Sequence, residues 1–345
     1  MGDDARTEYM YKYVSNKNWV AADAAIGGLV IGDKYLDDGK LYVAKYHADG
    51  SGQWIELNIA NPLISGYATY AFANQADVLI NCRLAADALG ATPMDRPEWA
   101  DVHPATGDIY VTLTNNRNRG AAGTTGRPLD AANPRYYNDG EGNTGNPNDH
   151  IIRMSETGND PVATSFRWDI YLFGAESDQF ANTHINVSGL TDDNDFSSPD
   201  GLWFSQANPG LMWIQTDDGA YTNVTNYMML AALPGRQGDG RTVSITNVAV
   251  PSNGNADQTV ITHAGAAATP AALKRFLVGP KDCEITGVAE TPDGRALFIN
   301  IQHPGEDTIA ANIATPTSNW PGTGVDRPRS ATIVITKNDG GLIGS

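Results

Sequence analysis

Short runs in which apolar and polar residues alternate recur along the chain and are separated by turn-forming residues. Alternation with period two is typical of strands that bury one face, and the Gly, Asp, Asn and Pro residues between the runs favour turns. The pattern therefore predicts many short strands, several of them paired as hairpins. The alternation is clear at residues 40–46 and 53–57, and further strands are predicted at 8–15, 150–154, 166–173, 274–278 and 331–336.

Helical spacing is convincing only in residues 72–89, where apolar residues recur at intervals of three or four positions. Gly90 follows as a stop signal. The sequence therefore predicts one short connecting helix here. Its apolar positions are Ala76, Leu79, Ile80, Leu84 and Ala88.

Three further strand pairs begin with an acidic residue. Glu98, Asp200 and Glu284 each stand just before a short apolar run, which a turn reverses into a second apolar run. Repeated hairpins of this kind predict an all-β fold with radially arranged sheets, a β-propeller, whose first strands share a central channel. We expect residues 1–345 to form a single domain with three to four blades of a six-bladed type of ring. The three acids would then converge on the channel.

The composition supports short strands and limits the possible ligands. The 345 residues include 36 Gly and 19 Pro, which interrupt long helices, and 41% are hydrophobic, enough for a sizeable core. The net charge of −17 repels nucleic acid and other anions at long range, so an anionic substrate needs local cations. No apolar run is long enough to span a membrane. Cys82 and Cys283 suit neither a zinc site nor a disulfide framework, although a single bridge between them stays open.

Residues 119–149 are rich in Gly, Asn, Asp and Pro and contain almost no aliphatic side chains. The segment is too long for an ordinary connection between strands. We therefore predict a long surface loop at the rim of the site.

Acidic and amide side chains give the chain many oxygen donors of the kind that calcium prefers. They include Asp3, Asp4, Glu98, Asn115, Asn116, Asp200, Asp217, Asp218 and Glu284. The alternative is that Asp and Asn only stabilise turns, and this is our interpretation of Asp293 in the sequence Thr-Pro-Asp-Gly. Glu98 and Asp200 differ, because each stands between Pro and an apolar strand, where an unpaired carboxylate is costly to bury. They are candidate metal ligands or catalytic groups.

Two basic side chains are also candidates. Arg96 either pairs with a neighbouring carboxylate or binds two phosphate oxygens through its forked guanidinium. His303 follows a strand and is a candidate proton donor or metal ligand, although a lone histidine in a loop is more often neither.

In its motifs and their order, the chain resembles the PhoX-type alkaline phosphatases, a family of secreted bacterial phosphomonoesterases. The resemblance covers nearly the whole chain and includes the tripeptide Arg-Pro-Glu at residues 96–98. The matching motifs are Met1–Glu8, Arg96–Glu98, Thr112–Asn116, His150–Arg153, Ser197–Trp203, Trp213–Asp217, Cys283–Gly287, Asn300–Glu306 and Arg327–Ala331.

The resemblance implies a metal-dependent phosphomonoester hydrolase with Fe³⁺ and Ca²⁺ ions at the centre of a β-propeller. It implies that Arg96 binds the substrate phosphate and that Glu98 is a metal-binding carboxylate, and we expect both to be catalytic. The further metal ligands that it implies are Glu8, Asp200, Glu284, Asp217 and Asn115.

The chain is similar only to the C-terminal part of the family's proteins. Their front part carries a twin-arginine export signal, the first blades and an iron-binding cysteine, whose position neither Cys82 nor Cys283 resembles. The resemblance therefore implies a periplasmic or secreted protein that associates with the missing N-terminal portion. Two alternatives stay open: a non-catalytic calcium-binding propeller fragment, and a calcium-dependent propeller lactonase, which gives no reason for the pairing of Arg96 with Glu98.

Overall fold

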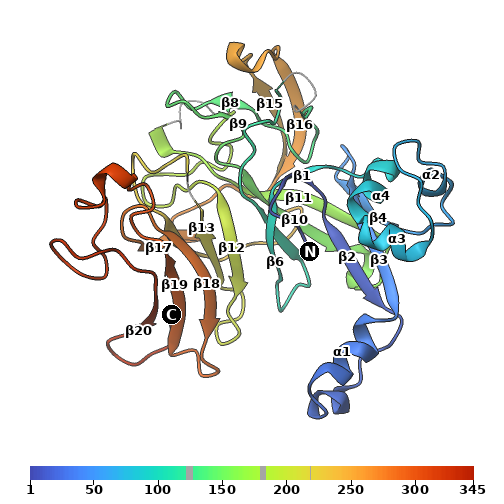
Figure 1. Cartoon of the computed structure of the whole chain (residues 1–345), viewed down its shortest axis with the longest axis horizontal. Helices are drawn as coiled ribbons and strands as arrows, with labels where there is room; N and C mark the ends of the chain where they lie inside the picture. Colours follow the sequence, from blue (N-terminus) through green and yellow to red (C-terminus); the bar gives the residue numbers. More distant parts are fainter. Residues whose placement is uncertain (122–126, 179–183, 218) are drawn as a thin grey trace.

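The computed structural model describes residues 1–121, 127–178, 184–217 and 219–345, and its architecture is mostly β (Figure 1). The largest sheet has nine strands. Along its main path the order is β2-β3-β4-β11-β10-β7-β6, and the hairpin β15–β16 joins through β16 beside β11. These strands are β2 (Tyr11–Ser15), β3 (Gly39–Tyr46), β4 (Ser51–Glu56), β6 (Pro97–Val102), β7 (Ile109–Leu113), β10 (His150–Glu156), β11 (Ser165–Phe173), β15 (Arg241–Asn247) and β16 (Gln258–Ala264).

Two smaller antiparallel sheets follow in the C-terminal half. One has the order β12-β13-β14-β17, with β12 (Pro199–Phe204), β13 (Met212–Thr216), β14 (Met228–Ala232) and β17 (Leu273–Val278). The other has the order β18-β19-β20, with β18 (Glu284–Glu290), β19 (Ala296–Gln302) and β20 (Ala331–Thr336). Two minor pairs complete the strands: β1 (Arg6–Glu8) with β5 (Met94–Asp95), and β8 (Tyr137–Asn138) with β9 (Thr144–Gly145).

The predicted strands at 40–46 and 53–57 are confirmed as the hairpin β3–β4. The predicted strand at 8–15 is instead divided, because the chain changes from one sheet to another after Glu8. Its first part belongs to β1, which pairs with β5, and its second part is β2, which pairs with β3.

The prediction of one connecting helix was wrong. The described residues contain α1 (Leu29–Leu36), α2 (Pro62–Ser65), α3 (Gln75–Ile80) and α4 (Cys82–Leu89), with short 3₁₀ turns at Ala21–Ala25, Thr157–Asn159, Pro251–Asn253 and Ala310–Asn312. Residues 72–89 form two helices because Asn81 leaves the helical region, with ψ of 43°. Its side chain donates to the carboxylate of Asp77 at 2.8 Å, which is the competition with the backbone that disfavours Asn inside helices.

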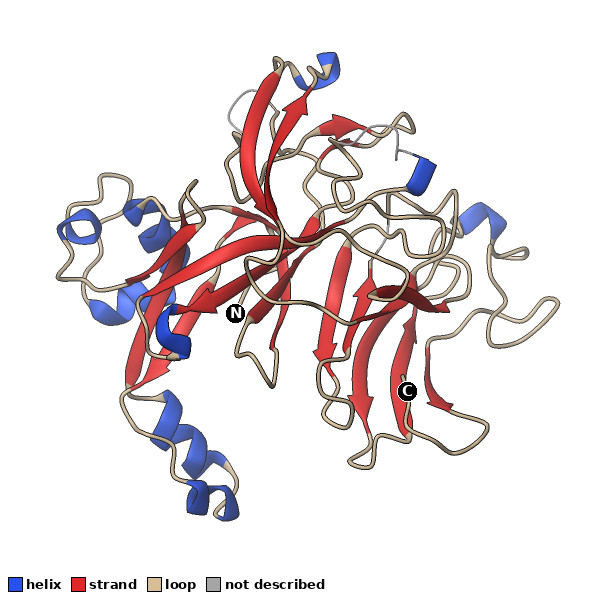
Figure 2. Cartoon of the chain, turned by 180° about the vertical axis from the view of Figure 1, so that it is seen from behind, coloured by secondary structure: helices blue, strands red, loops and turns tan. Residues whose placement is uncertain are grey.

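The sheets stack face to face, so that buried apolar side chains from neighbouring sheets form shared cores. Tyr110 and Leu172 of the large sheet pack with Leu202 and Ile214 of the second sheet. On the other face of the second sheet, Trp213 packs with the third sheet. Figure 2 shows the same succession from behind, with α1–α4 at one end and β18–β20 at the other.

The segment 119–149 does not lie on the surface along its whole length, and for its described central part this prediction was wrong. Asn133, Arg135, Asn146 and Asp149 are fully buried. Their polar atoms are largely satisfied inside the protein: Arg135, for example, donates to the carbonyl oxygens of Gly174 and Asp149 at 2.9 and 2.7 Å. Residues 122–126 of the segment, and the donor candidate Asp218, lie outside the described residues.

Candidate functional site

The three acids that begin strand pairs in the sequence occupy equivalent places in the three sheets. Glu98 is the second residue of β6, Asp200 the second of β12 and Glu284 the first of β18. β6, β12 and β18 each form one edge of their sheet's main path, and β12 makes contacts with both of the others. β12 therefore lies next to both of the other strands that carry these acids.

A repeated backbone feature precedes each acid. The residue two positions before it has a left-handed backbone, with φ of 52° at Arg96, 47° at Ser198 and 51° at Asp282. Residues other than Gly rarely adopt this backbone conformation, so its occurrence at three matching places indicates a repeated structural unit. Each of these first strands also carries an irregularity in its pairing near its start. Such irregularities redirect side chains at the end of a sheet.

Hydrogen bonds hold the first strands of neighbouring sheets together. Near the acids, the hydroxyl of Thr112, on β7 beside β6, donates to the carbonyl oxygen of Asp200 at 2.5 Å. Farther along β6 and β12, the backbone N–H of Phe204 donates to Asp101 at 2.7 Å. Glu290, at the end of β18, accepts from the Ser205 hydroxyl at 2.7 Å. These contacts fix the spacing of the three strands.

Arg96 is the basic group of the site. Its guanidinium donates to both carboxylate oxygens of Asp4, from Nε at 2.6 Å and from Nη2 at 3.0 Å, and Nη2 lies 3.9 Å from Asp217. The Arg96 side chain is 18% exposed and that of Asp4 is 47% exposed, so the pair lies at the solvent boundary. A planar fork that already binds a carboxylate in bidentate fashion has the geometry that also binds phosphate.

The acids raise one another's pKa values. Burial is the largest cause, and together with the hydrogen bond to Asp4 and the charge of Asp200 it raises the pKa of Glu98 to about 9. Burial and the charges of Glu284 and Asp217 raise the pKa of Asp200 to about 7, and burial with Asp217 raises that of Glu284 to about 7. Burial also raises the pKa of Asp217, although Arg96 opposes it. The carboxylates therefore form one group in which negative charges outnumber the positive charge of Arg96.

His303 belongs to the same group. It follows β19, its Nδ1 lies 2.8 Å from Glu306 and its Nε2 lies 3.5 Å from Glu284. Glu284 also accepts from Gln302 at 2.8 Å. We define the acidic group as Asp4, Glu98, Asp200, Asp217, Glu284 and Glu306, and Arg96 and His303 are the basic side chains that contact it.

Two predicted site residues lie apart from these contacts. Glu8 is buried and forms an ion pair with Arg83 of α4, and burial raises its pKa. Asn115 is partly buried and follows β7, next to Thr114, whose backbone N–H donates to the carbonyl oxygen of Arg96 at 3.2 Å. The sequence reasoning missed Glu306, whose place in the matching motif Asn300–Glu306 was the available signal.

Metal binding can be judged from the donors present. Carboxylates that are crowded, half-buried and short of positive charge have the chemistry that hard cations such as Ca²⁺ prefer. Among the described residues, however, no three or more His, Cys, Asp or Glu side chains lie close enough together to enclose a metal ion. Cys82 and Cys283 are both free thiols, so the bridge between them is not formed. The oxygen donors of the acidic group are therefore of the type that binds a hard cation. The described His, Cys, Asp and Glu side chains do not by themselves enclose a metal ion.

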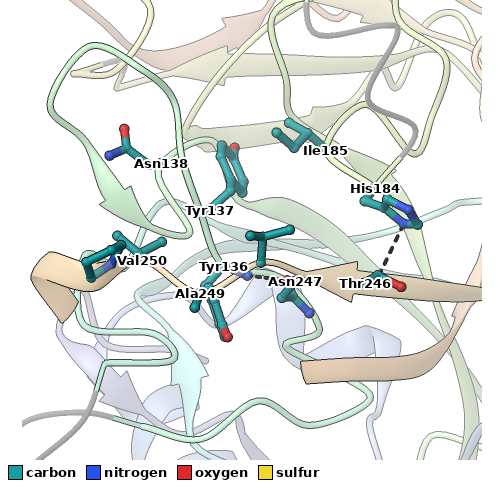
Figure 3. Close-up of a pocket in the computed structure, with 11 residues that line it drawn as sticks. Tyr136, Tyr137, Asn138, His184, Ile185, Thr246, Asn247, Ala249 and Val250 are labelled. Carbon is teal, nitrogen blue, oxygen red and sulfur yellow. Dashed lines mark hydrogen bonds between the residues drawn. The ribbon is translucent and has the colours of Figure 1, made fainter. Parts of the chain in front are cut away.

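A separate cavity of about 240 Å³ lies beside β8 and β15 (Figure 3). Its polar atoms are used within the protein: Asn247 accepts from the Tyr136 backbone at 2.7 Å, and His184 accepts from the Thr246 backbone at 3.2 Å. No member of the acidic group lines it. The chemistry of the site is therefore assigned to the acidic group, and not to this cavity.

Comparison with known proteins gives a family and a solved structure. The family model described as alkaline phosphatase PhoX matches residues 1–305. The chain is similar to Pseudomonas fluorescens PhoX in complex with vanadate, a transition state analogue, with 35% identity and a TM-score of 0.75. The alignment covers 100% of this chain and 51% of that chain, so the chain spans about half the length of that protein. The curated proteins include no match. No helix in the described parts of the chain has the length and apolarity to cross a bilayer.

Proposed function

Since the chain belongs to the alkaline phosphatase PhoX family, we propose that it is a metal-dependent phosphomonoester hydrolase whose substrate binds at Arg96 and the acidic group. The observation that carries the proposal is that three acidic strand starts and Arg96, remote in sequence, share one electrostatic environment. Phosphoryl transfer depends mainly on positioning and charge neutralisation, which such a site can provide.

The proposed architecture is part of a β-propeller. Three blades would be the sheets β6-β7-β10-β11, β12-β13-β14-β17 and β18-β19-β20, with β6, β12 and β18 innermost. The face-to-face packing of these sheets and the contacts among their first strands support this assignment. Because the chain spans about half of its solved relative, we propose that it associates with a portion equivalent to the other half.

Arg96 would bind the substrate by exchanging one anion for another. Its Nε and Nη2 atoms hold Asp4, and a phosphate can accept the same pair of hydrogen bonds. Although burial opposes it, hydrogen bonds from Arg96 and Glu98 lower the pKa of Asp4, which therefore stays charged. Asp4 would then move toward solvent, where nearly half of its side chain already lies.

The residues proposed to hold Fe³⁺ and Ca²⁺ are Glu98, Asp200, Asp217 and Glu284, with Glu8 and Asn115 as further ligands. When bound, these cations would supply the positive charge that draws a phosphate ester into an acidic site and makes water a stronger acid. Glu98 would release its proton on binding them. His303, which lies between Glu284 and Glu306, is the proposed proton donor of the site.

Hydrolysis of p-nitrophenyl phosphate tests the proposal directly. The purified chain is assayed with added Fe³⁺ and Ca²⁺, with a chelator, and as the Arg96→Ala variant. We expect hydrolysis that needs the cations and is lost with Arg96. Hydrolysis of a lactone without phosphatase activity would instead support a propeller lactonase.

A second candidate function is cation binding without catalysis. It is favoured because the chain spans about half of its relative and because its described acids do not enclose a metal ion. In that case calcium binds, but no phosphomonoester is hydrolysed until the equivalent of the other half is added. The same assay, repeated with that half, separates the two functions.

We also propose a periplasmic or secreted location and export by the twin-arginine pathway, on the basis of the family alone. Fractionation of cells that express the natural gene tests this. Recovery of the protein in the cytoplasm of cells with a working twin-arginine pathway would contradict it.

A further inference from the structure

Asp95, which precedes Arg96 in the chain, forms a buried ion pair with Arg119 that the proposed reaction does not use. Asp95, the last residue of β5, has no exposed surface, and the Arg119 side chain is 1% exposed. One Asp95 oxygen accepts from Arg119 Nε at 2.9 Å and from Asn116 at 2.6 Å, and it lies 2.7 Å from Arg119 Nη2 in an ion pair. The other accepts from Asn146 at 3.4 Å. The carboxylate next to Arg96 is thus held from several sides.

Arg119 also binds two backbone carbonyl groups, one of them two residues before Asp95. Its Nη2 donates to the carbonyl oxygen of Pro93 and its Nη1 to that of Pro128, both at 2.9 Å. The Arg96 carbonyl oxygen accepts from the Thr114 backbone at 3.2 Å. Residues 93–96 are therefore fixed by one guanidinium and one neighbouring strand end.

Arg96 needs such support because its own backbone is left-handed, with φ of 52°. A residue in this conformation is strained by about 1–3 kcal/mol and keeps it only where its surroundings enforce it. The left-handed backbone conformation also determines the direction in which the Arg96 side chain leaves the chain. A buried ion pair contributes little net stability compared with apolar residues, so its use at this place is better explained by geometry than by stability.

We propose that Asp95 and Arg119 are a positioning pair, which holds Arg96 in its left-handed conformation and aims its guanidinium at the substrate phosphate. The inference rests on the proposed function for the identity of the ligand, and on the contacts above for the positioning. Neither Asp95 nor Arg119 is proposed to touch the substrate.

The chain offers a matched control in Arg153 and Asp169. Arg153 donates to both oxygens of Asp169, at 2.9 and 2.8 Å, and the two side chains are 0% and 2% exposed. The pair joins β10 to β11 and does not adjoin Arg96 in sequence. Arg153 also donates to Asp239 at 2.7 Å, so the Asp169→Asn variant measures what removing one buried carboxylate partner of an arginine does to stability.

The test compares Asp95→Asn with Asp169→Asn in titrations with inorganic phosphate in the presence of Ca²⁺, alongside thermal unfolding. We expect both variants to lose stability. Only Asp95→Asn should bind phosphate more weakly, by about 10-fold, which is the loss expected when a residue that orients a binding side chain is removed. In the Arg96→Ala background, Asp95→Asn should change phosphate affinity no further. An equal loss in that background, an equal loss in Asp169→Asn, or no loss in Asp95→Asn overturns the positioning role.

A second pair of variants, Arg119→Lys and Arg153→Lys, keeps all charges and removes only the forked geometry, so it serves if the Asn variants do not fold. The NMR signal of the Arg96 Nε–H, which donates to Asp4, gives a measurement that needs no phosphate. We expect Arg119→Lys to increase its exchange with water and Arg153→Lys to leave it unchanged. If the unmodified chain binds no phosphate, the proposed function fails, and equal exchange in both variants would separately overturn the positioning.

Discussion

Calcium binding is expected to displace protons from the acidic group, by an amount that the pKa values determine. With a pKa of about 9, Glu98 is almost fully protonated at pH 7, whereas Asp200 and Glu284, with pKa values of about 7, are each half protonated. Carboxylates must lose their protons to bind a metal ion, so binding at pH 7 should release about two protons. At pH 8 only Glu98 remains mostly protonated, and the release should fall to about one.

Titration calorimetry in buffers with different ionisation enthalpies measures this release. The Glu98→Gln variant should release about one proton fewer than the unmodified chain at either pH, because it removes the group that carries a full proton. Asp293→Asn is a suitable control, since Asp293 is an exposed turn residue that accepts from the backbone of Arg295 at 3.2 Å. A release near zero at pH 7, or an unchanged release in Glu98→Gln, would show that these carboxylates do not lose protons to the bound calcium.

Two further predictions concern stability and substrate affinity. In chelator, the free energy of unfolding should fall as the pH rises from about 5 to 9, because the raised folded pKa values of Glu98, Asp200 and Glu284 mean that the folded state holds more protons than the unfolded state. Urea unfolding at a series of pH values measures this, and a rise across the window would contradict it. Arg96→Ala should weaken phosphate binding by about 2 kcal/mol, roughly thirty-fold, because charged hydrogen bonds are lost, and should leave bound metal unchanged. Phosphate titration with metal analysis checks this, and full phosphate affinity would remove Arg96 from the site.

The repeated strand pairs could be predicted because their signals are local. Alternating residues reveal a strand with one buried face wherever it pairs, as in the hairpin β3–β4. The acids at 98, 200 and 284 stand near the start of the first strand of each unit, and β12 contacts both β6 and β18. Asp293 also behaves as its turn sequence predicts, since it accepts from Thr291 and Arg295.

The missed features depend on partners that are remote in sequence. Polar residues in 119–149 suggest exposure, but Arg119 is buried because Asp95, 24 positions earlier, neutralises it. Asp4 reaches Arg96 across 92 positions, so the pair is invisible to any local pattern. The break between α3 and α4 depends on the hydrogen bond from the Asn81 side chain to Asp77, which cannot be predicted from the spacing of apolar residues.

Glu98 and Glu284, which lie on different sheets, are proposed to act in one cation site. A double-mutant cycle on calcium affinity tests it most directly, with Glu98→Gln, Glu284→Gln and the double variant titrated alongside the unmodified chain. We predict that the two substitutions are not additive and that their interaction energy exceeds about 1 kcal/mol. Additive losses, or calcium binding that neither substitution weakens, would contradict the claim.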